Sequence, residues 1–98
     1  MARPERVPLA VPIEVGTGQA VNVFRLRDKT VQVSGVFAGS LQLEGTIDGE
    51  DFESMGGALT APGFVVVPLT VELVRVRLNE LTSGAPRVTL AGFDVRAR

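Results

Sequence analysis

The sequence contains no cysteine, histidine, tryptophan or tyrosine, and its only aromatic residues are five phenylalanines. Without cysteine and histidine it has no disulfide bonds, no thiolate or imidazole ligands for a metal ion, and no nucleophile of either type. The 98 residues correspond to one small domain, which leaves little room for the walls of a substrate cleft. We therefore expect a protein that is not an enzyme and that holds no cofactor and no metal ion.

The chain also lacks an excess of charge of one sign. Nine arginines and one lysine are spread along it and are balanced by eleven acidic residues, whereas nucleic-acid modules usually concentrate basic residues on one face. The longest uncharged stretch, residues 55–71, contains three glycines and two prolines and barely reaches the length of a membrane-spanning helix. Prolines at positions 4, 8 and 12 interrupt the apolar core that a signal peptide needs. We expect no nucleic-acid partner, no membrane anchor and no secretion by that route.

What the sequence does contain is the two-residue periodicity of β-strands, with many β-branched residues. The segments 31–37 and 41–47 both alternate between apolar and polar positions. The dipeptide Ala38-Gly39 between them predicts a two-residue hairpin turn. In these strands Phe37, Leu43 and Ile47 are predicted to lie in the core.

A third alternating strand is predicted over residues 71–78. Val74, Val76 and Leu78 share one face, which we assign to the core, while Arg75 and Arg77 share the other. Guanidinium groups commonly pair with carboxylates across interfaces. The two arginines either clamp such a carboxylate or lie on a solvated face.

The remaining strands carry weaker signals. Residues 19–26 predict a strand of ambiguous parity that ends in the charged turn 27–29, and Pro68 predicts an edge or a strand end after the apolar run 64–69. In the last strand, residues 87–95, the apolar positions change parity at Gly92. Either a β-bulge at Gly92 restores the register, or the strand is regular and apolar on both faces.

About seven short strands separated by turn residues predict an all-β fold, namely a small antiparallel β-sandwich of jelly-roll-like type over residues 17–98. Residues 1–16 are predicted to form an extended N-terminal arm outside it, because prolines prevent a helix there. The arm either packs on its own sandwich or lies on a neighbouring subunit by strand addition. Its alternating apolar residues are candidates for a partner interface: Val7, Leu9, Val11 and Ile13.

An acidic cluster lies at residues 48–53, beside the turn dipeptide Asp48-Gly49. Oxygen ligands close together resemble the start of a calcium loop, but the spacing of an EF-hand is absent. A solvated acidic tip is the favoured interpretation, and a cation site is the alternative. The five phenylalanines all fall at positions that core packing explains.

Several segments together resemble small β-sandwich modules of tailed-phage virion proteins. They are the stretch Leu41–Phe52, the Leu59-Thr60 turn, the strand Val74–Arg77 and the final Val88–Gly92. The chain departs from the commonest pattern of these modules in carrying Thr46 where serine is usual and a phenylalanine where tryptophan is usual.

The resemblance implies a structural part of a virion, assembled in the host cytoplasm. A capsid decoration or cement subunit is the first expectation, and a tail or head-fibre component is the second. The implied partners are the major capsid protein or other virion subunits, together with further copies of the chain, with a trimer favoured. A carbohydrate-binding or adhesin-type module is the alternative function, although it would need exposed aromatic platforms.

Overall fold

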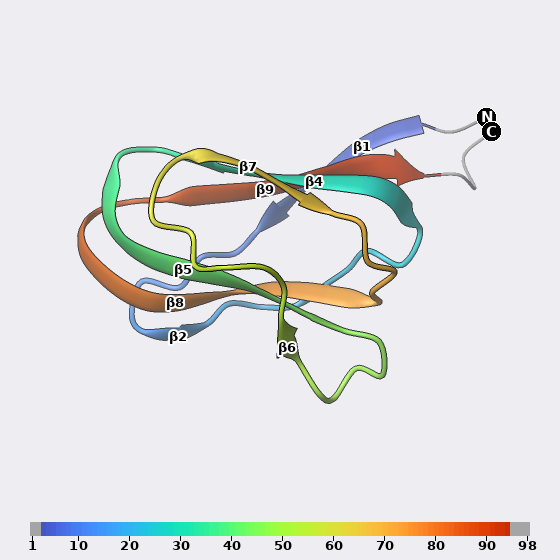
Figure 1. Cartoon of the computed structure of the whole chain (residues 1–98), viewed down its shortest axis with the longest axis horizontal. Coiled ribbons are helices and arrows are strands. Elements are labelled where there is room, and N and C mark those ends of the chain that lie inside the picture. Colours follow the sequence, from blue (N-terminus) through green and yellow to red (C-terminus); the bar gives the residue numbers. More distant parts are fainter. Residues whose placement is uncertain (1–2, 95–98) are drawn as a thin grey trace.

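The computed structural model describes residues 3–94, and within that range the chain forms two antiparallel β-sheets and no helix. The two sheets lie in layers, one above the other, so the predicted all-β sandwich is confirmed (Figure 1). Three of the strands are only two residues long and carry no periodicity of their own. The strands are β1 (Arg3–Leu9), β2 (Gly16–Thr17), β3 (Val21–Asn22), β4 (Leu26–Ser34), β5 (Phe37–Thr46), β6 (Glu53–Ser54), β7 (Gly63–Val67), β8 (Leu73–Gly84) and β9 (Arg87–Asp94).

One sheet has the order β1-β9-β4-β7, and the other has the order β2-β8-β5-β6, with β3 also paired to β8. Two of the connections between the layers are tight corners, one after β4 and one after β8 (Figure 1). Gly35 and Gly84 occupy these corners with positive φ angles of 94° and 83°. The corners contact each other, since the amide of Ala85 donates a hydrogen bond to the carbonyl of Val36 at 3.2 Å.

The hairpin predicted at Ala38-Gly39 is therefore wrong. The turn lies earlier, and the strands on either side of it belong to different sheets. Gly39 lies within β5, where a Cβ atom would come 2.2 Å from the carbonyl oxygen of Glu80 on β8. Gly39 is therefore required for the close approach of β5 to β8 and not for a turn.

The core fills the space between the layers. The predicted parities of residues 31–33 and 74–78 are confirmed. The prediction that Ile47 lies in the core is wrong: 71% of its surface is exposed, because β5 ends one residue before it. Phe37 is half-buried at the margin of the core. The side chains with almost no exposed surface come from both sheets: Leu41, Leu43, Leu78, Leu90, Val23, Val31, Val33, Val74 and Val76.

The N-terminal segment joins the sandwich instead of leaving it. Strand β1 pairs with β9 without interruption, from Arg3 opposite Asp94 to Leu9 opposite Val88. Val7 and Leu9 are buried in the core of this chain. Residues 3–9 therefore form an edge strand, as in the first of the two interpretations of the arm; residues 1 and 2 lie outside the described range.

The first alternative, a β-bulge at Gly92 in the last strand, is wrong: β9 is regular, and Phe93 stays on the outward face with 43% of its surface exposed. A bulge lies instead on the neighbouring strand. Strand β9 runs regularly past β1, whereas its pairing with β4 shifts between Arg27 and Thr30, so that two residues of β4 stand opposite Gly92. Asp28, one of those two, adopts a positive φ of 53°. The exit turn predicted at residues 27–29 is wrong, because these residues lie within β4 and include the bulge. The last predicted strand residue, Val95, lies outside the described residues.

Candidate interaction surface

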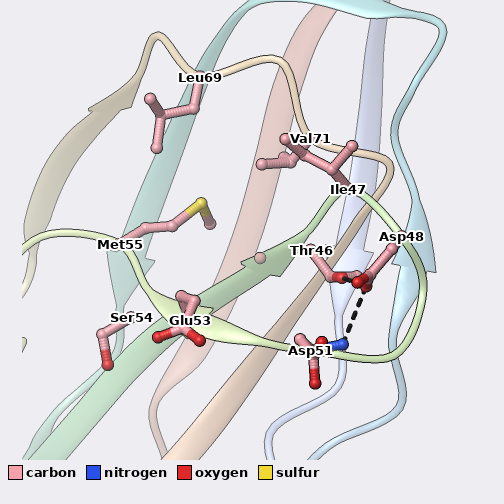
Figure 2. Close-up of a pocket in the computed structure, with 10 residues that line it drawn as sticks. Thr46, Ile47, Asp48, Asp51, Glu53, Ser54, Met55, Leu69 and Val71 are labelled. Atoms are coloured by element: carbon pink, nitrogen blue, oxygen red, sulfur yellow. Dashed lines mark hydrogen bonds between the residues drawn. The ribbon is translucent and has the colours of Figure 1, made fainter.

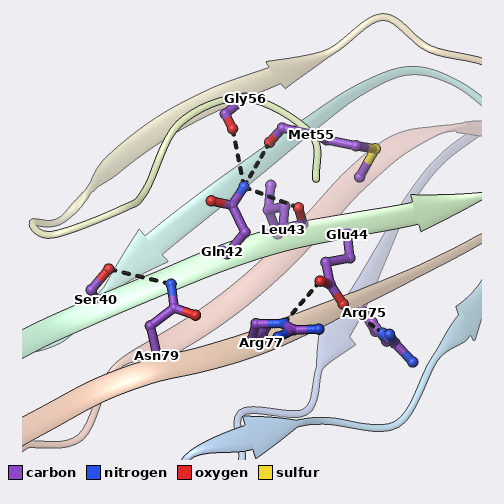
Figure 3. A network of polar contacts seen from close by, with 9 residues as sticks. All are labelled: Ser40, Gln42, Leu43, Glu44, Met55, Gly56, Arg75, Arg77 and Asn79. Carbon is purple, nitrogen blue, oxygen red and sulfur yellow. Dashed lines mark hydrogen bonds and ion pairs between the residues drawn. The ribbon is translucent and has the colours of Figure 1, made fainter. Parts of the chain in front are cut away.

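Arg75 and Arg77 lie on the outer face of β8, as predicted, and both bind Glu44 of β5. The Nε atom of Arg75 donates to Oε1 of Glu44 at 2.8 Å, and that of Arg77 donates to Oε2 at 2.9 Å (Figure 3). The Glu44 side chain is only 6% exposed. The carboxylate that pairs with the two arginines thus belongs to the same chain. The alternation of the strand alone places Glu44 on the solvent face, so its burial is not predictable from the sequence.

We call Glu44 with its two arginines the Glu44 cluster. A second set of contacts attaches residues 52–56, which follow the acidic tip, to strands β5 and β8 beside it. The guanidinium of Arg75 lies 3.8 Å from the centre of the Phe52 ring, a cation–π contact. The side-chain amide of Gln42 donates to the carbonyl of Gly56 at 3.0 Å and to that of Met55 at 3.4 Å (Figure 3). These contacts hold residues 52–56 against β5 and β8.

The acidic tip is held by its own backbone. The Oδ1 atom of Asp48 accepts hydrogen bonds from the Thr46 hydroxyl at 2.8 Å and from the amides of Glu50 and Asp51 at 2.8 and 2.9 Å. The hydrogen bonds from these two backbone amides are the largest cause of the low pKa of Asp48, which is about 2. Among residues 3–94 no three potential metal ligands gather, so the geometry gives the cation alternative no support.

An apolar groove lies on the open side of the sandwich, between the β5–β6 region of one sheet and the segment after β7 of the other. It has a volume of about 460 Å³, and its lining includes Gly45, Ile47, Met55, Leu69 and Val71. Figure 2 shows the side chains of Ile47, Met55, Leu69 and Val71 gathered around the hollow, with Asp51 and Glu53 at its polar end. We call this hollow the apolar groove.

The groove has a buried floor and an exposed rim. Met55 and Val71 are buried, whereas Ile47 and Leu69 are exposed. Gly45 makes room for the floor, because a Cβ atom there would lie 2.7 Å from the Met55 sulfur. A smaller hollow of about 270 Å³ shares Met55 and Leu69 and extends to residues 65–67 of β7 and to Pro68 after it.

The interface candidates of the N-terminal segment are not part of the apolar groove. Val7 and Leu9 are buried in the core, so they are not available to a partner while β1 stays in its sheet. Val11 is half-buried against the core, and Ile13 is 92% exposed. The sequence signals of the groove are the uncharged stretch 55–71 and its apolar run, which by themselves indicate a strand but no groove.

The phenylalanines also differ from the prediction. Phe24, Phe64 and Phe93 are exposed, and only Phe37 and Phe52 are half-buried. Core packing therefore does not explain all five.

Within residues 3–94 no helix has the length and apolar character to cross a membrane. Comparisons with protein-family models, with curated proteins and with solved structures found no match.

Proposed function

We propose that the chain is a non-enzymatic structural subunit of a virion, of the capsid decoration type, which attaches to another virion protein through the apolar groove. The observation that supports this proposal is the exposed apolar rim of the groove over a buried apolar floor. Exposed apolar surface that is contiguous and bordered by polar residues is typical of protein interaction sites.

The energetics favour a protein partner. A fully buried aliphatic side chain contributes about 1.5–3 kcal/mol relative to an exposed one. Covering Ile47 and Leu69 while a partner side chain enters the groove therefore supplies several such contributions in one place.

A carbohydrate-binding or adhesin-type module is the second candidate, and one observation favours it. Phe64 and Phe93 are exposed on the outward face of the same sheet, and exposed rings are what sugar-binding surfaces use. However, β4 separates the two strands that carry these rings. The rings are not neighbours, and we rank this candidate below the structural role.

Cosedimentation with empty heads of the particle that encodes the chain tests the proposal. We expect the wild-type protein to bind heads that lack it, and Leu69→Ser and Ile47→Ser to bind at least about tenfold more weakly, because each removes rim surface. The matched control is Val36→Ser, which changes an exposed valine at the corner after β4, outside the apolar groove.

A glycan array run in parallel separates the two candidates. Binding to heads that is lost in the groove variants, with no signal on the array, supports the virion role. A glycan signal that Phe64→Ala abolishes, with no binding to heads, overturns it in favour of the carbohydrate-binding module.

A further inference from the structure

Strand β7 leaves one edge of its sheet open. It pairs with β4 alone, and among residues 3–94 no strand lies beyond it. Alternate residues of an edge strand direct their backbone N–H and C=O groups away from the sheet, where another strand can bind them. The side chains of Phe64 and Val66 on the outward face are 72% and 71% exposed.

The opposite edge of the same sheet is protected in ways that β7 is not. Strand β1 carries Pro4 and Pro8, which lack an N–H group, and the charged Arg3 and Arg6. Such residues are the usual means by which proteins prevent strand pairing at an edge. Strand β7 has neither a proline nor a charge from its first residue to its last.

The sequence around β7 is symmetric in the way that self-pairing requires. Pro62 and Pro68 lie at equal distances from Val65 and bound the strand on both sides. If two copies pair antiparallel about Val65, all four prolines fall outside the ladder, and each Phe64 faces the Val66 of the other copy. Aromatic and β-branched residues form favourable cross-strand pairs.

We infer that β7 pairs antiparallel with β7 of a second copy of this chain, with the two-fold axis at Val65, so that two four-stranded sheets become one continuous sheet. The two edges bring no charged side chain to the junction, because residues 55–71 contain none, and so nothing in the strands repels a second copy. A two-fold contact closes as a dimer, in place of the trimer that the resemblance favours. Ile47 and the acidic tip lie outside this contact, so the dimer does not depend on the proposed virion role.

The contact is short, so the dimer is expected to be weak, with a dissociation constant in the micromolar range or above. Sedimentation velocity from about 1 µM to about 1 mM should show a reversible monomer–dimer equilibrium. Phe64→Lys combined with Val66→Lys should weaken the dimer at least about tenfold, because lysines then oppose each other across the axis. Ala91→Lys, on the outer face of β9 away from both edges, is the matched control and should leave the equilibrium unchanged.

A charge swap tests the register. Phe64→Lys combined with Val66→Glu places each new lysine opposite the new glutamate of the other copy, so it should restore association relative to the double lysine variant. Circular dichroism of every variant establishes that the sandwich is folded. A wild-type chain that stays monomeric, a trimer, equal loss in Ala91→Lys, or no recovery in the charge swap would each overturn the inference. Ile47→Ser should dimerise normally even where it fails to bind heads, so the two proposals can fail separately.

Discussion

The aliphatic stem of Lys29 on β4 occupies the space that Gly92 on β9 leaves open. A Cβ atom on Gly92 would lie 3.3 Å from Cγ of Lys29 and 3.0 Å from the carbonyl oxygen of Arg27. The bulge in β4 turns Lys29 inward, where it is 4% exposed and its Nζ donates a hydrogen bond to the carbonyl of Leu26 at 3.3 Å. A glycine on one strand thus accommodates a bulge on the next.

The buried lysine predicts a pH dependence of stability. Burial lowers the pKa of Lys29 below its ordinary value of 10.5, against a smaller opposite effect of Asp28. The folded state therefore releases this proton more readily than the unfolded state, and the free energy of unfolding should rise as the pH approaches 10.5. Lys29→Met should abolish that rise and stabilise the protein at pH 7 by about 1 kcal/mol.

The contribution of Lys29 to this pH dependence can be isolated, because Lys29 is the chain's only lysine and the chain has no cysteine, histidine or tyrosine. No other side chain titrates between about pH 7 and pH 11. Urea unfolding of both proteins across that range gives the difference. A parallel pH dependence in wild type and Lys29→Met would contradict the prediction.

The Glu44 cluster predicts a loss of stability when its charge is removed. Glu44→Gln leaves two guanidinium groups beside a neutral amide, and because Arg77 is about half exposed the cost should be about 1–3 kcal/mol in the free energy of unfolding. Glu80→Gln, at an exposed position of β8, is the control and should change it by less than about 0.5 kcal/mol. Equal urea midpoints for the two variants would show that the cluster adds nothing to stability.

The acidic tip predicts an acid-sensitive contribution from Asp48. Since its pKa is lowered to about 2, the contribution is complete above the ordinary value of 3.8 and is lost as the pH falls toward 2. Asp48→Asn keeps an acceptor oxygen but cannot titrate, so its melting temperature should vary less across this interval than that of the wild type. Glu50→Gln is the control, because the Glu50 carboxylate accepts no hydrogen bond within residues 3–94. An unchanged acid profile in Asp48→Asn would refute the assignment.

Substitution by alanine is expected to have opposite effects on stability at Gly39 and at Gly57. Gly39→Ala should destabilise by about 2 kcal/mol or more, because the new Cβ would meet backbone atoms of β8, which cannot move aside as a flexible side chain can. Gly57→Ala meets no atom within 4 Å and should stabilise by about 0.4–1 kcal/mol through the unfolded chain. Thermal unfolding of the two variants tests the pair; a tolerated Gly39→Ala would mean that β5 and β8 can separate locally.

The local pattern was sufficient for the strand faces but not for the strand partners. The alternation of Val74, Val76 and Leu78 with the two arginines follows from the two-residue period of any strand, so it was predictable. The parity change at Gly92 left a bulge and a regular strand as alternatives, and the structure contains the regular strand. The bulge in β4 has no signal in the alternation of β9. Ile47 fitted the pattern of β5, but the strand ends at Thr46, whose hydroxyl begins the Asp48 turn.

By itself, the sequence determined the all-β class, the inward and outward faces of residues 31–33 and 74–78, and the end of β7 before Pro68, because these depend on neighbouring residues in the chain. The tertiary structure alone decided that the two long strands on either side of Gly35 enter different sheets, that β1 belongs to the sandwich, and that Glu44 is buried between two arginines. These features depend on contacts between residues distant in the sequence. The free energy of such contacts is set by which surfaces meet, and the alternation of a single strand does not contain that information.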